Sequence, residues 1–252
     1  MEFIRIILVL LFGSAVGSFI NVLSARTVAG QSLWMPRSFC DACAKPLWRR
    51  DLIPVVSFFL LKARCRFCNI KIAWQYPLVE LVTALLFLAA YLKWWQDPGQ
   101  MVMAWIVITA VIALFLTDIR AMVLPDQISI PAIVVLLGFD MIVLGKDPKT
   151  VLWALLIGGG FFFLQYLFSR GKWIGSGDIR FGLLMSAALG DWQRTVIAIF
   201  FSYILGALIT LPLMFAKRVN LKTAVPLGVF LAVGTLAVLF FGDYLIQWFL
   251  NP

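Results

Sequence analysis

Histidine is absent from the 252-residue chain. This absence excludes Ser–His–Asp hydrolases, HExxH metalloproteases and catalytic zinc sites built on imidazole. Any hydrolytic chemistry must therefore use carboxylates, lysine, cysteine or serine. Charged residues are also scarce, at 13% of the chain against about 25% in a typical soluble domain. Because hydrophobic residues make up 63%, the composition excludes an ordinary soluble globule and a disordered chain, and it predicts an all-α polytopic membrane protein.

Eight apolar runs predict about eight transmembrane helices, since one crossing needs about 20 apolar residues. They cover residues 4–23, 77–95, 101–117, 128–144, 151–168, 181–189, 196–216 and 225–250. The run at 181–189 is too short to cross the bilayer alone. We therefore expect a first transmembrane helix over residues 1–25, a small extramembrane domain over 26–76 and a membrane domain over 77–252.

The net charge of +9 indicates how the chain is oriented. Lysine and arginine accumulate in cytoplasmic loops, and with eight spans, sixteen of the 21 basic residues fall on the side of residues 26–76. This predicts a cytoplasmic domain and both termini on the non-cytoplasmic side. Because loop orientation accounts for the basic excess, we expect the lipid bilayer as a partner and no nucleic acid.

All four cysteines lie in the predicted cytoplasmic domain, as the pairs Cys40/Cys43 and Cys65/Cys68. Each CxxC turn can present two thiolates to one tetrahedral Zn²⁺, and four soft ligands suit that metal. A domain this small also needs a stabilising crosslink, such as a bound metal or disulfides, because its hydrophobic core is marginal. Disulfides and a redox-active CxxC are the alternatives, although cytoplasmic cysteines are normally reduced. The spacing therefore favours a structural zinc site.

Two aspartates at the edges of apolar runs are candidates for catalysis, because carboxylates in or near a bilayer are costly. Asp118 ends the run 101–117, and Asp178 follows Gly175-Ser176-Gly177. Two carboxyls that face one water can cleave a peptide bond: the ionised one takes a proton from water, and the protonated one polarises the carbonyl. Gly175 and Gly177 would let backbone and substrate approach closely.

Other acids near the membrane have structural interpretations. Asp118 itself could pair with Arg120 at the interface. Asp126 follows Pro125 and is expected to cap a helix N-terminus rather than to act in catalysis. Asp140 stands alone within an apolar run, where a buried hydrogen bond or helix contact is the expected role.

The order of these motifs resembles the bacterial type IV prepilin peptidases, membrane aspartic proteases of the GxGD class. The resemblance covers nearly the whole chain. It is carried by the two CxxC pairs and by residues 17–22 (GSFINV), 75–80 (QYPLVE), 117–126 (TDIR to LPD), 175–180 (GSGDIR) and 226–232 (PLGVFLA).

The resemblance implies that Asp118 and Asp178 form a catalytic pair. It also implies a bacterial inner-membrane enzyme that removes, on the cytoplasmic side, the basic leader of type IV prepilins or type II secretion pseudopilins. Members of the family often also methylate the new N-terminal amine with S-adenosylmethionine.

Several positions depart from the family pattern. Gln75 replaces the usual arginine, and Arg180 replaces a lysine with retention of charge. Residues 26–28 replace the family's R-L-P. Ala63 stands where the family has a glycine associated with methyl transfer. S-adenosylmethionine is therefore expected as a cofactor only if that second activity is retained.

A basic leader must approach a basic cytoplasmic face, which Coulomb's law disfavours. Some acids must therefore offset the positive charge locally. Asp51 and Glu80 are predicted to do so, because they flank the second CxxC pair and the return into the membrane. The alternative is ordinary salt bridging with Arg49, Arg50 or Lys71.

Two other function classes compete with the peptidase. One is a small membrane transporter that uses intramembrane aspartates as proton or cation sites. The other is a zinc-stapled assembly factor without catalytic activity. Because the sequence shows no paired inverted repeats of the kind typical of transporters, the peptidase is the main prediction.

Overall fold

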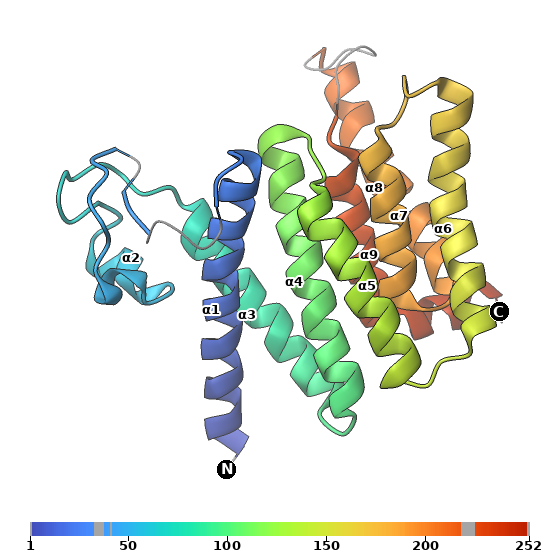
Figure 1. Cartoon of the computed structure of the whole chain (residues 1–252), viewed down its shortest axis with the longest axis horizontal. Coiled ribbons are helices and arrows are strands. Elements are labelled where there is room, and N and C mark those ends of the chain that lie inside the picture. Colours follow the sequence, from blue (N-terminus) through green and yellow to red (C-terminus); the bar gives the residue numbers. More distant parts are fainter. Residues whose placement is uncertain (1, 33–37, 41, 218–224, 251–252) are drawn as a thin grey trace. The chain divides into compact units, whose positions relative to one another are not determined.

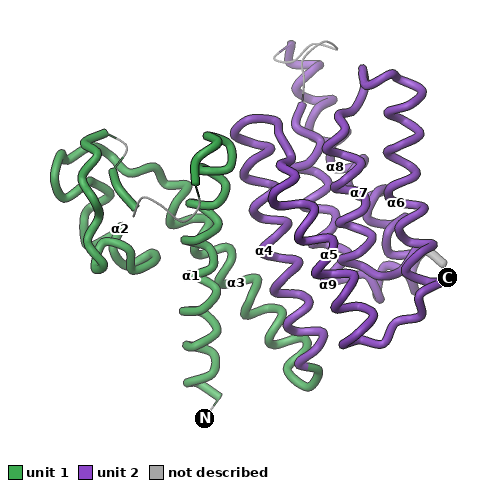
Figure 2. The backbone as a smooth tube through the Cα atoms, in the orientation of Figure 1, with its two compact units in different colours: residues 1–97 green, residues 98–252 purple. Residues whose placement is uncertain are grey.

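The computed structural model describes residues 2–32, 38–40, 42–217 and 225–250. In these residues all regular elements are helices, and the only strand-like pairing consists of two isolated β-bridges. The all-α prediction is thus confirmed. The chain forms two compact units, residues 1–97 and residues 98–252 (Figure 2). The predicted division at residues 25/26 and 76/77 stays a prediction.

Unit 1 consists of two long helices that pack closely together (Figure 1). The segment that connects them in sequence forms a small domain. The two helices contact through small residues, as is common in membranes. A Cβ added at Gly17 would lie only 2.7 Å from the Cα of Glu80, and Asn21 Nδ2 donates to the Tyr76 carbonyl at 3.2 Å. The elements are α1 (Glu2–Val28), η1 (Arg49–Leu52), α2 (Val56–Leu60) and α3 (Gln75–Trp94).

Unit 2 is a bundle of six helices. Helix α7 packs against α4, α5, α6, α8 and α9, and its Phe181, Leu184 and Met185 are fully buried. The N-terminus of this central helix is therefore held by its neighbours. The elements are α4 (Pro98–Ala121), α5 (Asp126–Ile142), α6 (Pro148–Ser169), α7 (Ser176–Leu189), α8 (Trp192–Phe215) and α9 (Leu227–Leu250).

The number of helices able to cross a membrane is smaller than predicted. Each of the eight apolar runs coincides with a helix, but within the described residues only six are long and apolar enough to span: α1, α3, α4, α6, α8 and α9. Helix α5 has 17 residues and α7 has 14. At about 1.5 Å per residue, α7 covers about 21 Å of a hydrocarbon core about 30 Å thick. Apolar content thus located α7, which is shorter than an ordinary span and is surrounded by the other helices of unit 2.

Candidate active site and metal centre

Asp118 lies in the last turn of α4 and is held by the first turn of α9. Its Oδ2 accepts a hydrogen bond from the Val229 backbone N–H at 3.0 Å, and the side chain is buried. First-turn amides have no partner within their own helix, and the helix N-terminus favours negative charge. A buried carboxylate at this position is therefore satisfied by backbone from a segment 111 residues away in sequence.

Gly228 makes this approach sterically possible. A Cβ added at Gly228 would lie 2.7 Å from Oδ2 and 3.0 Å from Cγ of Asp118, closer than real Cβ atoms come to such neighbours. Gly228 was not among the site residues predicted from the sequence, although it stands within the 226–232 motif. In the sequence, only its position as a glycine near the start of the apolar run 225–250 could have pointed to it.

Asp178 lies in the first turn of α7 and is also buried. Its Oδ2 accepts from the Gly175 backbone N–H at 2.9 Å, which is the second half of a capping box. The two glycines predicted to support the site, Gly175 and Gly177, differ in the space available for a side chain. A Cβ at Gly177 would lie 3.0 Å from Leu124 Cβ, whereas one at Gly175 would meet only ordinary contacts, beginning at 3.7 Å. Gly177 is therefore the position where close packing requires glycine.

The end of α4 and the starts of α7 and α9 meet in one corner of unit 2. Asp118 adjoins Gly228 at the start of α9, and Asp178 follows Gly177 at the start of α7. Leu124 packs against the starts of both α7 and α9. Cβ atoms added at Gly177 and Gly228 would lie 3.0 and 3.1 Å from its side chain. The two predicted aspartates, 60 positions apart, therefore share one buried site whose carboxyls have different partners.

Asp126 is not the helix cap that the sequence predicted. The cap position of α5 is Pro125, whose backbone is extended, and Asp126 is the first helical residue. The Asp126 carboxylate instead pairs with Arg180 of α7, with 2.5 Å between Oδ1 and Nη1. This ion pair links the starts of α5 and α7, and because both partners are partly exposed it contributes about 0–1 kcal/mol.

Asp140 is fully buried, and its carboxylate pairs with Lys146 Nζ at 2.7 Å. The expected buried contact is thus confirmed. The partner lies just beyond the C-terminal end of α5, whereas Asp126 begins that helix. The Asp140–Lys146 ion pair therefore has a structural role at the C-terminal end of α5, opposite to the end where Asp126 lies.

The four cysteines gather into one cluster, as the spacing predicted. Their Sγ atoms all lie within 4.8 Å of one another, and the Cys40–Cys68 separation is 3.8 Å. A tetrahedral site with Zn–S bonds of about 2.3 Å places its sulfur atoms about 3.8 Å apart. The observed spacing is far longer than a disulfide bond of about 2.05 Å. The cluster therefore has the donor set and the size of a metal site.

The two CxxC turns have the same local structure. The Cys40 N–H donates to the Lys45 carbonyl at 3.0 Å, and the Cys65 N–H donates to the Ile70 carbonyl at 2.9 Å. The Cys65 thiol accepts hydrogen bonds from the Cys68 and Phe67 backbone amides, which lower its pKa to about 7. Backbone amides therefore favour the thiolate form, which is the form that binds a metal.

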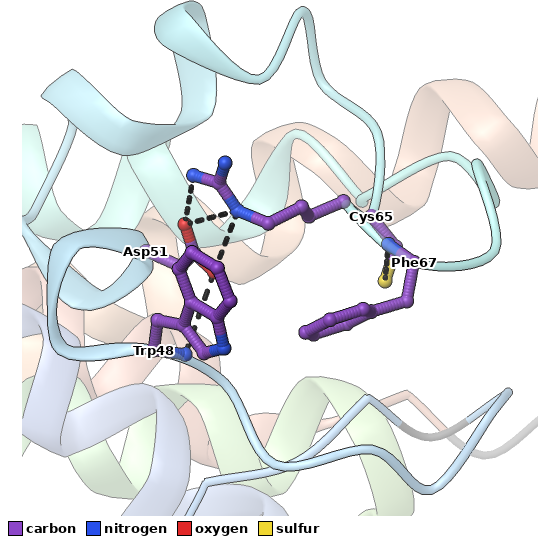
Figure 3. Close-up of polar contacts among 5 residues, drawn as sticks. Trp48, Asp51, Cys65 and Phe67 are labelled. Atoms are coloured by element: carbon purple, nitrogen blue, oxygen red, sulfur yellow. Dashed lines mark hydrogen bonds and ion pairs between the residues drawn. The ribbon is translucent and has the colours of Figure 1, made fainter.

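Asp51 lies beside this cluster and pairs with Arg66, which neither sequence interpretation named (Figure 3). Arg66 Nη2 and Nε donate to Asp51 Oδ1 at 2.6 and 3.1 Å, and the guanidinium also lies over the Trp48 ring. The Arg66 hydrogen bond holds the pKa of Asp51 below its ordinary value. This pair joins the stretch after the first CxxC turn to the second CxxC turn.

Glu80 is buried in the second turn of α3. Its Oε2 accepts from the Val55 N–H at 2.7 Å, and the Ser18 hydroxyl also hydrogen-bonds to the carboxyl. Val55 precedes α2 and has φ +60°, a conformation that a β-branched residue rarely adopts. The Glu80 carboxylate thus fixes the start of α2 against α3, a contact that the sequence did not reveal.

Two family models match the chain. The bacterial peptidase A24 N-terminal domain matches residues 11–94, and the type IV leader peptidase family matches residues 105–211. Among similar curated proteins, the prepilin leader peptidase/N-methyltransferase of Bacillus subtilis (strain 168) is 30% identical over 245 residues, covering 96% of each chain. The protein of the same name from Aeromonas salmonicida is 29% identical over 274 residues, covering 97% of this chain and 93% of that protein. No solved structure matches.

Proposed function

This chain belongs to the type IV leader peptidase family, and on that premise we propose that it is a membrane aspartic endopeptidase. Its proposed substrates are type IV prepilins or type II secretion pseudopilins, from which it removes the basic leader. The observation that carries the proposal is that Asp118 and Asp178 are both buried where the end of α4 adjoins the starts of α7 and α9. Incubation of the purified chain with a prepilin-like precursor tests it: cleavage after the leader glycine is expected.

The proposed mechanism assigns different tasks to the two carboxyls. The α9 first-turn amide favours the ionised form of Asp118, which takes a proton from the attacking water. Protonated Asp178 transfers its proton to the scissile carbonyl oxygen as water adds to the carbon, which gives a neutral diol intermediate. When the C–N bond breaks, the leaving amine takes the proton held by Asp118, and Asp178 regains its own.

The proposed location is the bacterial inner membrane, where the six candidate spans make the chain a multi-pass protein. The cytoplasmic placement of residues 26–76 is supported by the nine lysines and arginines within that segment. Both termini then fall on the non-cytoplasmic side for any even number of spans. The transporter alternative has no support among the similar proteins, whose names denote a peptidase.

We propose that Cys40, Cys43, Cys65 and Cys68 hold one Zn²⁺. The fit rests on four thiols of suitable spacing and on two CxxC turns that present them in the same way. A metal bound there would supply a structural crosslink between the turns. The chain's own residues already orient the cluster through the Asp51–Arg66 pair.

N-methylation of the new N-terminal amine by S-adenosylmethionine rests on the relatives' name and on the family resemblance. None of the contacts in the described part of the chain identifies a site for the methyl donor. Ala63, at the position where the family has glycine, has φ +57°. Glycine adopts that left-handed conformation without a steric cost, so the backbone explains the family's preference there.

Gly228→Ala is expected to lower kcat about 10–100-fold with little change in KM. The added Cβ must displace the Asp118 carboxylate, and a small misplacement of a catalytic group costs rate rather than uniform binding. Steady-state cleavage kinetics measure the effect.

Gly160→Ala is the matched control, because no described atom lies within 4 Å of a Cβ added there. That variant is expected to keep wild-type kcat. Val229→Ala, which keeps the backbone N–H, is expected to do the same. An unchanged kcat in Gly228→Ala would remove Gly228 as a positioning residue.

Asp51→Asn is expected to raise KM for a lysine-rich leader about two- to fivefold at low ionic strength and to leave kcat unchanged. The variant removes a negative charge and frees the Arg66 guanidinium, so the domain repels a basic leader more strongly. The effect should fade as salt rises.

A leader whose lysines are replaced by neutral residues is the control, since its KM should not respond to the substitution. An unchanged KM for the lysine-rich leader at low salt would leave Asp51 with its structural pair alone. For Glu80, burial and the Val55 contact favour the structural role.

A further inference from the structure

The small domain of unit 1 carries an apolar surface that its core does not use. Phe58 of α2 is buried, but Phe59 and Leu60 are 60% and 75% exposed, and Val56 is exposed as well. Trp74, the residue before α3, is 67% exposed, and its ring lies 4.9 Å from that of Phe58 and 6.3 Å from that of Phe59. We call Val56, Phe59, Leu60 and Trp74 the α2 surface.

The α2 surface lies at the depth of a membrane span. Val55, which immediately precedes α2, donates its backbone N–H to Glu80, and Glu80 lies in the second turn of α3 rather than before it. The Cα of Glu80 would lie 2.7 Å from a Cβ added at Gly17, which stands well before the C-terminal end of α1 at Val28. Since α1 and α3 are both candidate spans, α2 is level with their outer turns. Exposed apolar and aromatic side chains at that level are more stable in the interfacial layer of a bilayer than in bulk water.

Basic side chains accompany the α2 surface. Arg64 and Lys71 face each other across an antiparallel bridge, so their side chains lie on one face. Lys62 lies two residues after the end of α2, and all three are exposed. Among the described residues none of the three has an ion-pair partner. Like charges directly opposite each other are destabilising unless an anion lies nearby.

We propose that the α2 surface inserts into the interfacial layer of the bilayer and that Lys62, Arg64 and Lys71 bind anionic lipid headgroups. The chemistry is that of a short interfacial anchor: apolar and aromatic residues at the acyl boundary, with lysine and arginine at the phosphates. Depth and charge favour lipid over a protein partner. The anchor would hold the cysteine cluster at the membrane surface, beside the outer turns of α1 and α3.

Photo-crosslinking of the full chain in nanodiscs tests this proposal. Leu60 is replaced by the photoreactive residue p-benzoylphenylalanine, and the chain is placed in nanodiscs that contain phosphatidylglycerol. Mass spectrometry is expected to find phospholipid adducts at this position. The same replacement at Trp48 is the matched control, because Trp48 is an exposed aromatic residue that lies beside Arg66 near the cysteine cluster. No lipid adducts are expected there.

Charge dependence gives a second readout. Adduct yield at position 60 should be several-fold higher with phosphatidylglycerol than with phosphatidylcholine, and Arg64→Gln with Lys71→Gln should remove that difference. Adducts with protein alone, or equal lipid labelling at positions 48 and 60, would overturn the proposal. Because the readout is lipid labelling, its failure leaves the proposed peptidase activity untouched.

Discussion

Asp118→Asn and Asp178→Asn are each expected to abolish cleavage of a prepilin-like precursor and to leave unit 2 folded. Asparagine keeps an oxygen that can accept the Val229 N–H at position 118 or the Gly175 N–H at position 178. It cannot take a proton from water or give one to a carbonyl. General acid–base catalysis contributes about 10²–10⁴-fold, so kcat should fall by at least that range. Cleavage kinetics and thermal unfolding of the same preparations measure the two effects.

Asp126→Asn is the matched control for the catalytic aspartates. It removes a carboxylate from the same region of unit 2, but one that is partly exposed and paired with Arg180. We expect activity close to that of the wild type, since such pairs contribute about 0–1 kcal/mol. Wild-type turnover in either Asp118→Asn or Asp178→Asn would contradict the assignment of the pair.

Cys40→Ser is expected to release the metal and to unfold the domain between α1 and α3. The wild-type chain should contain one zinc per molecule by elemental analysis, and the variant none. Structural zinc in small finger peptides is bound with an apparent free energy of about 10–16 kcal/mol, which is folding free energy for a domain with little core of its own. Hydrogen exchange in residues 42–73 should rise sharply, whereas exchange in unit 2 should stay unchanged.

Ala42→Ser is the control, because it places a hydroxyl in the same CxxC turn at an exposed position that supplies no ligand. It should retain both the zinc and the exchange protection. A wild-type chain that is folded without metal and has no free thiols would instead indicate disulfides.

The sequence by itself determined which groups are available for catalysis, where the long helices lie and which family the chain belongs to. The lack of histidine restricted hydrolysis to other groups, and apolar runs located the eight long helices because helix formation and burial depend on local patterns. The two CxxC pairs identified the four thiols that form one cluster, since each turn carries its two thiols within four residues. The motifs around Asp118 and Asp178 indicated the family, which the relatives confirm.

Only the tertiary structure decided which groups meet. The Val229 amide reaches Asp118 across 111 positions, and Asp51 pairs with Arg66 rather than with the adjacent arginines. It also decided that α7 is the helix surrounded by the other five of unit 2. The physical reason is common to these cases: periodicity and spacing constrain a residue's immediate neighbours, whereas the partner of a buried polar group is set by how helices pack.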